Sequence, residues 1–235
     1  MNISAQGWLR AVGATLNAPA DVASQVLAHR YARPILMQAV VVLAIVNLML
    51  IAVVSFIAPA PVDLVVQVTP ISLTTLIAAR MIILASALSQ AGRILGGTGG
   101  FDAALTLVIW LQAVGLTFDL LQIALMGLSP TLSALFGIGT LFALLWCTVN
   151  FVQVLHGFTS LGKAAATLAI AMIVLITLAS LIALASEFDE SLAVPKTMTE
   201  RHLSTAAIFR LVNDDGEPER VTTRVFCVSG KIKAR

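Results

Sequence analysis

Long apolar stretches without charge occupy most of the chain. Asp, Glu, Lys and Arg are absent from residues 34–62, 64–79, 81–92, 103–118, 120–162 and 164–186. An α-helix rises about 1.5 Å per residue, so about 20 apolar residues cross a hydrocarbon core about 30 Å thick. The stretches supply that length several times over. They predict an integral membrane protein rather than a soluble helical one.

Prolines and glycines divide the apolar stretches into five predicted spans. Pro34, Pro70 and Pro130 stand where helices would begin, while Gly96 and Gly127 stand near helix ends. The glycine-rich residues 96–100 are interpreted as a flexible turn between two spans rather than a phosphate-binding loop, because the Gly-Lys-Ser/Thr ending of such a loop is absent. The predicted spans are residues 35–58, 70–94, 101–126, 130–155 and 163–185. The expected fold class is therefore an all-α integral membrane bundle of five transmembrane helices over residues 35–185.

The leader, residues 1–34, is more polar than the spans. Trp8, Val12 and Leu16 are spaced four apart and would share one face of a helix. A second short helix would follow Pro19. An amphipathic leader of this kind is expected to lie at the membrane interface on the cytoplasmic side, although a loosely ordered leader is the alternative.

The polar tail, residues 186–235, differs in composition from the rest. The whole chain is 59% hydrophobic and 11% charged, with a mean hydropathy of +0.98. The tail nevertheless contains eight of the 14 Lys and Arg and eight of the 12 Asp and Glu. Residues 207–212 and 221–228 resemble strands, and the turn residues 213–216 between them are compatible with a small β-hairpin.

Basic residues near the span ends predict an orientation. Arg30 and Arg33 precede the first span, Arg93 closes the second and Lys163 opens the fifth. The loop between the first two spans and the turn between the third and fourth contain no Lys or Arg. Cytoplasmic loops are enriched in Lys and Arg. The N-terminus is therefore expected in the cytoplasm and the C-terminus on the opposite side.

Four polar residues interrupt the predicted spans at membrane depth. Arg80, Gln112 and Asn47 lie near the middle of their spans, and Asp119 lies seven residues after Gln112 on the same helical face. Ionisable groups are expensive at this depth and usually face protein or water. The cluster is interpreted as a hydrogen-bonded clamp between helices, with a polar pathway for a solute or ion as the alternative.

The fourth predicted span carries a second polar face formed by Trp146, Asn150 and Gln153, with His156 at its cytoplasmic edge. His156 is interpreted as a hydrogen-bonding group at the boundary rather than a ligand or base. The sequence contains no spacing typical of a metal site, cofactor site, catalytic nucleophile or nucleic-acid surface in the membrane region. We therefore expect no cofactor, no metal, no nucleic-acid partner and no enzymatic activity.

Two segments resemble a known family. The segments are Gly92–Phe101, which runs Gly-Arg-Ile-Leu-Gly-Gly-Thr-Gly-Gly-Phe, and Asn150–Phe158, followed by Ser160 and Lys163-Ala164-Ala165. They resemble the start of the third span and the junction before the last span in bacterial members of the Yip-one family of multi-spanning membrane proteins. The resemblance covers roughly residues 19–185, and it implies a bacterial inner-membrane location.

The resemblance implies a non-catalytic protein of the membrane-organising or trafficking type. Eukaryotic relatives associate with Rab-type GTPases, but the Asp-Leu-Tyr-Gly-Pro-like motif that they carry before the first span is absent here. The expected partners are membrane lipid and other membrane proteins or a second copy. The expected function is to bind membrane partners or organise the bilayer. A small-solute or ion transporter and an accessory subunit of a larger membrane complex are the alternatives.

Overall fold

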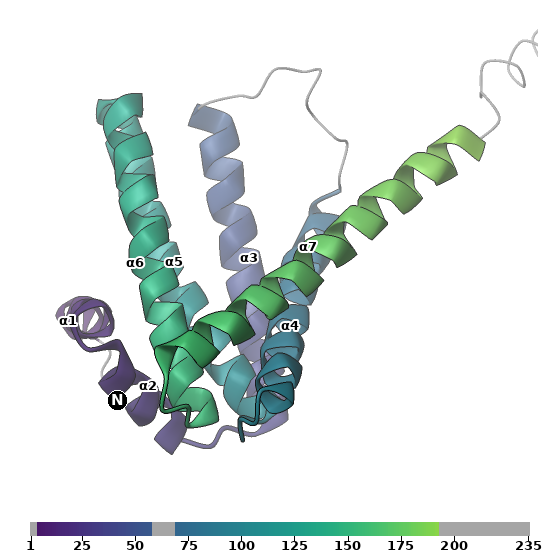
Figure 1. Cartoon of the computed structure of the whole chain (residues 1–235). Coiled ribbons are helices and arrows are strands. Elements are labelled where there is room, and N and C mark those ends of the chain that lie inside the picture. The colour runs from purple at the N-terminus through teal and green to yellow at the C-terminus, as the bar shows by residue number, and fades with distance from the viewer. Residues whose placement is uncertain (1–3, 58–68, 193–235) are drawn as a thin grey trace, which may run out of the picture. The chain divides into compact units, whose positions relative to one another are not determined.

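A computed structural model describes the backbone of residues 4–57 and 69–192, and the side chains of these residues up to Leu184. The chain divides into two compact units, Met1–Ala179 and Ser180–Arg235. The helices of the described residues are α1 (Ala5–Asn17), α2 (Pro19–Ala28), α3 (Arg33–Ile57), α4 (Pro70–Ile94), α5 (Phe101–Leu128), α6 (Pro130–His156) and α7 (Leu161–Leu192) (Figure 1). The predicted β-hairpin and Cys227 lie outside the described residues.

Helices α3 to α6 and the segment Leu161–Leu184 of α7 are long and apolar enough to cross a membrane. The prediction of an all-α bundle with five such helices is confirmed. The ends of these helices follow local chemistry. Thr69 and Ser129 each precede a proline at the first helical position, and each side chain accepts a hydrogen bond from a first-turn amide. Gly157 ends α6 in the left-handed region, at φ 65°.

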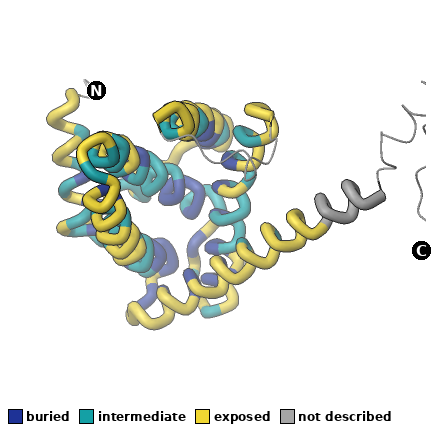
Figure 2. The backbone as a smooth tube through the Cα atoms, turned by 90° about the horizontal axis from the view of Figure 1, so that it is seen from above, coloured by how far each residue is buried: buried dark blue, intermediate teal, exposed yellow. Residues whose placement is uncertain are grey.

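Helix α5 is the centre of the Met1–Ala179 unit, because α2, α3, α4 and α6 all pack against it. The core contains the fully buried side chains of Val40 from α3, Met81 from α4, Leu105 from α5 and Phe151 from α6. Buried positions lie on the faces that the helices turn toward one another, whereas the outer faces are exposed (Figure 2). An exposed apolar exterior is what lipid requires of a membrane bundle.

The leader forms α1 and α2, and α1 is attached to the bundle by hydrogen bonds. Figure 1 shows α1 along its own axis while α3, α5 and α6 run up the view, so α1 crosses the direction of these spans. Trp8 Nε1 donates to Thr117 Oγ1 at 2.9 Å, and Trp110 Nε1 donates to Thr15 Oγ1 at 3.2 Å. The two indole rings meet edge to face at 5.7 Å. Trp8, from the predicted helical face, and Thr15 therefore hold α1 against α5.

Candidate functional site

Two features of the bundle contain the residues selected from the sequence. The first is a polar groove at membrane depth. The second is the glycine loop, residues 96–100 between α4 and α5, which lies against His156. In the polar groove, Arg80 Nη2 donates a hydrogen bond to Gln112 Oε1 at 3.1 Å. This bond joins α4 to α5 near the middle of both helices. It leaves most of the donors of the guanidinium group available, since arginine has five.

Two adjoining cavities define the polar groove. A cavity of about 380 Å³ is lined by Asn47, Arg80, Gln112 and Asp119, together with apolar side chains of α4, α5 and α6. A second cavity, of about 360 Å³, is lined by Asn47 and Asp119 again and by Ser133 from α6. Because the two cavities share Asn47 and Asp119, the polar groove follows the line where α3 and α5 meet.

Charges in the polar groove are not neutralised by direct pairing. Among the described residues the one ion pair is Arg33–Asp102, at 2.9 Å, so Arg80 and Asp119 do not form a salt bridge. Arg80 and Asp119 are exposed, whereas Gln112 and Asn47 are half-buried. A cation and a carboxylate thus line an open groove between the helices, at a depth where lipid cannot solvate them.

His156 is buried at the end of α6 and is hydrogen-bonded through both ring nitrogens. The amide of Gly99 donates to Nδ1 at 3.1 Å, and Nε2 lies 3.2 Å from the carbonyl oxygen of Leu88. An amide can only donate, so Nδ1 is the acceptor and the ring proton is on Nε2, which donates to Leu88. The ring also stacks on Phe158, with centroids 5.3 Å apart.

Three glycines surround the imidazole of His156. A Cβ added to Gly97 would lie 2.5 Å from His156 Cβ, and one added to Gly99 would lie 2.7 Å from its Nδ1 and Cε1. A Cβ at Gly92 would overlap the ring itself. By contrast, Gly100 has open space at this position. The glycines at 92, 97 and 99 are therefore required by the close approach of the backbone to His156.

The loop between α4 and α5 is hydrogen-bonded both to the end of α6 and to α4 itself. Thr98 N donates to the His156 carbonyl at 3.4 Å, and Ser89 Oγ donates to the Gly99 carbonyl at 3.3 Å. The sequence favoured a flexible turn over residues 96–100, but the structure shows a loop held by side chains and backbone of α4 and α6. The two segments that carry the family resemblance are thus in contact through His156.

The other residues of the predicted polar face on α6 differ in how far the fold buries them. Trp146 is exposed, Gln153 is half-buried and Asn150 is buried with its amide donating to the Trp146 carbonyl at 2.8 Å. Only His156 contacts a second element through an observed hydrogen bond. Within the described residues no group of three or more His, Cys, Asp or Glu could hold a metal ion.

A family model described as Yip1 domain matches residues 14–183, which extends from α1 into α7. No curated protein and no solved structure matches the chain. The match includes the polar groove, the glycine loop and His156.

Proposed function

Since the chain belongs to the Yip1 domain family, we propose that this integral membrane protein is non-catalytic and acts by binding other membrane proteins. The polar groove is the proposed binding site. The partner would be a transmembrane helix with polar side chains that complement Arg80 and Asp119.

The observation that carries this proposal is the exposure of Arg80 and Asp119 at membrane depth. A charged side chain near the bilayer centre costs several kcal/mol unless protein or water surrounds it. The polar groove is open, and acceptor groups on a partner helix would accept hydrogen bonds from the donors of Arg80 that Gln112 leaves unused. Side-chain packing in the membrane also favours small residues, and Ser133 lines the same groove.

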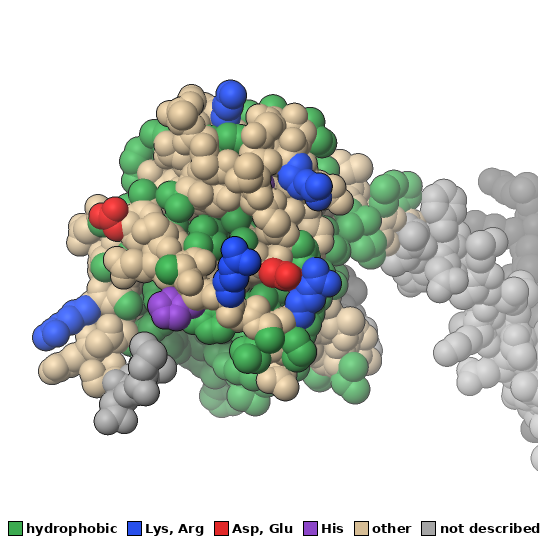
Figure 3. Space-filling view, turned by 90° about the horizontal axis from the view of Figure 1, so that it is seen from below, with side chains coloured by type: hydrophobic (Ala, Val, Ile, Leu, Met, Phe, Trp, Pro, Cys, Tyr) green, Lys and Arg blue, Asp and Glu red, His purple; other side chains and the backbone are tan. Residues whose placement is uncertain are grey.

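The proposed orientation places the N-terminus in the cytoplasm and the C-terminus on the opposite side of a bacterial inner membrane. Arg30 precedes α3 and Arg33 is its first residue. Arg93 lies in the last turn of α4, and Lys163 lies in the first turn of α7. Figure 3 shows Lys and Arg side chains spread over one end of the molecule. The cytoplasmic ends of membrane helices carry this excess of basic residues.

A second candidate function is passage of a small solute or ion along the polar groove. The sharing of Asn47 and Asp119 by two cavities favours this reading, because polar side chains then succeed one another along the bundle. An accessory subunit is a special case of the first proposal, in which the partner is fixed and stoichiometric.

The test compares the wild-type chain with the double variant Arg80→Gln, Asp119→Asn in native membranes. After chemical crosslinking, the wild type is expected to purify with a discrete membrane protein that the double variant loses. The variant Arg93→Gln is the matched control, because Arg93 lies at a helix end and lines neither cavity of the groove. Proton and potassium flux in reconstituted vesicles that depends on Asp119, without loss of any partner, would favour the second candidate instead.

A further inference from the structure

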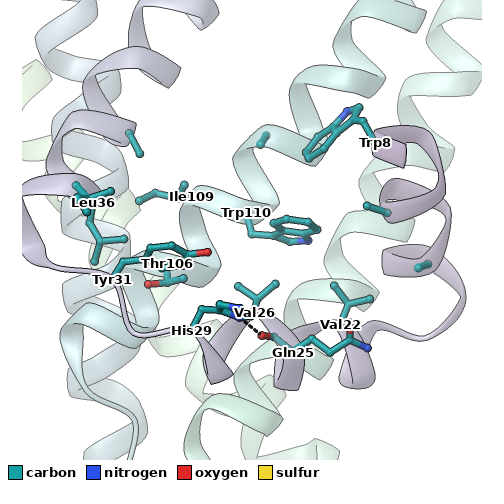
Figure 4. Close-up of a pocket in the computed structure, with 15 residues that line it drawn as sticks. Trp8, Val22, Gln25, Val26, His29, Tyr31, Leu36, Thr106, Ile109 and Trp110 are labelled. Atoms are coloured by element: carbon teal, nitrogen blue, oxygen red, sulfur yellow. Dashed lines mark hydrogen bonds between the residues drawn. The ribbon is translucent and has the colours of Figure 1, made fainter. Parts of the chain in front are cut away.

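An apolar cavity of about 490 Å³ lies between the leader helices, the first turns of α3 and the N-terminal half of α5. Figure 4 shows Trp8 and Trp110 on one side of it and Leu36 and Ile109 on the other, with Val26 of α2 below. The volume is within the range of small-molecule sites in proteins, about 300–1,000 Å³. This cavity is separate from the polar groove, with which it shares no residue.

A polar cavity of about 560 Å³ adjoins the apolar one. Arg30 and Arg33 line it from the α2–α3 connection and the start of α3, and Gly99 and Gly100 line it from the α4–α5 loop. The residues that line both cavities are His29, Tyr31 and Thr106. Because they share these residues, the apolar cavity and the polar cavity are direct neighbours.

The polar cavity has an excess of positive charge. Arg30 makes no hydrogen bond or ion pair with another described residue, and Arg33 is paired through Nε with Asp102. Two guanidinium groups thus face one carboxylate. Gly100 is the N-cap of α5 and has no side chain to accept hydrogen bonds from the first-turn amides. These amides and the positive end of a long helix lie beside the two arginines.

The depth of the two cavities matches that of one bilayer leaflet. The polar cavity lies at the first residues of α3 and α5, where these spans enter the membrane. The apolar cavity reaches Ala113, which is about 18 Å along α5 from Phe101 at 1.5 Å per residue. Half of a hydrocarbon core is about 15 Å thick. A charged group at the polar end and a long apolar chain at the other end would fill both cavities.

We propose that the two cavities together hold one anionic glycerophospholipid. The phosphate lies against Arg30 and Arg33 beside the start of α5, and an acyl chain extends past Thr106 and between Trp110 and Leu36. Arg30 supplies an unpaired cation for the headgroup, whereas Arg33 is shared between the headgroup and Asp102. Trp8 and Trp110, which join α1 to α5, form the wall of the acyl-chain cavity.

Bromine on the acyl chain quenches tryptophan on contact, so the two wall tryptophans report occupancy directly. The chain contains three tryptophans, and Trp146→Phe leaves only Trp8 and Trp110. The full-length Trp146→Phe protein is reconstituted in phosphatidylcholine with a small fraction of brominated phosphatidylglycerol or, separately, brominated phosphatidylcholine. We expect stronger quenching by the anionic lipid, and Arg30→Gln should lower its apparent affinity about fivefold. Arg93→Gln, which removes a cation that lines neither cavity, should leave the preference intact.

A second variant tests the apolar cavity. Ala39→Phe fills the acyl-chain cavity from α3 and should reduce the quenching, whereas Ala52→Phe, on an exposed part of the same helix, should not. Equal quenching by the two brominated lipids, or the same change in Arg30→Gln and Arg93→Gln, would overturn the proposal. Quenching that persists in Ala39→Phe would also overturn it. Relief of quenching by millimolar glycerol 3-phosphate would assign the polar cavity to a soluble phosphate rather than to a lipid.

Discussion

His156 and Gly99 are joined by a hydrogen bond in which the glycine amide donates to Nδ1 at 3.1 Å, although they lie 57 residues apart in the chain. This contact fixes the neutral Nε2–H tautomer of the imidazole, because the other nitrogen donates to the Leu88 carbonyl. A loop that connects α4 and α5 is in this way held by the end of α6. The two segments that carry the family resemblance are therefore in direct contact.

Replacement of His156 by alanine should destabilise the bundle. The change leaves the Gly99 amide and the Leu88 carbonyl without their partners, and each buried loss costs about 1–3 kcal/mol. For a chain of this size, two such losses should lower the thermal midpoint in detergent by about 4–24 °C. Gln153→Ala, one turn earlier and half-buried, is the control. An unchanged midpoint for His156→Ala would show that the loop is held by other contacts.

Two alanine substitutions in the glycine loop should differ sharply. Gly99→Ala brings a Cβ within 2.7 Å of His156 and should cost about 1–3 kcal/mol through overpacking. Gly100→Ala meets nothing within 4 Å and should leave the thermal midpoint unchanged. Both substitutions alter the same backbone flexibility at adjacent positions. Equal destabilisation of the two variants would therefore mean that the loop needs glycine for backbone flexibility, and not because His156 approaches its backbone closely.

The pair Arg80 and Gln112 should be energetically coupled if it acts as a clamp between α4 and α5. Arg80→Leu and Gln112→Leu should each lower the yield of folded protein, measured by gel filtration in detergent. The double variant should lose less than the sum of the two, by about 0.6–1.7 kcal/mol in a thermal or denaturant titration. Normal yield in Arg80→Leu together with altered solute flux would instead support the pathway interpretation.

The attachment of α1 to the bundle should depend on Trp8. Trp8→Phe keeps the ring contact with Trp110 but removes the hydrogen bond to Thr117, which contributes about 1 kcal/mol. Opening of α1 should become about fivefold more frequent. Trypsin cleavage after Arg10 reports that opening, and Leu9→Ala, at an exposed position of the same helix, is the control. The same cleavage rate in wild type and Trp8→Phe would mean that this bond does not hold the leader.

The sequence predicted the helices well because each span combines apolar length with a local end signal. Pro70 and Pro130 begin helices as expected. The glycine loop was interpreted as flexible, because its positions say nothing about a histidine far along the chain. A close approach of that kind depends on tertiary packing, and only the shared family resemblance of the two segments could have signalled it.

For the polar groove, the sequence predicted the depth of the polar residues but not the contacts between them. Helical period and depth place Arg80, Gln112 and Asn47 at one level of the membrane, but they do not say which side chain meets which. The hydrogen bond from Arg80 to Gln112 depends on the crossing of α4 and α5. The pair Arg33–Asp102 was not predicted at all, since both residues stand at helix starts that the chain brings together from distant positions.

Site-specific photocrosslinking in native membranes tests the proposed partner site most directly. A benzoylphenylalanine replaces Leu84, an apolar residue that lines the polar groove, or Ile173, an exposed residue of α7 that lines none of its cavities. We predict a discrete protein adduct from position 84 that disappears in the Arg80→Gln, Asp119→Asn background, and only lipid adducts from position 173. Lipid adducts alone from both positions, or the same protein adduct from both, would contradict a partner helix in the groove.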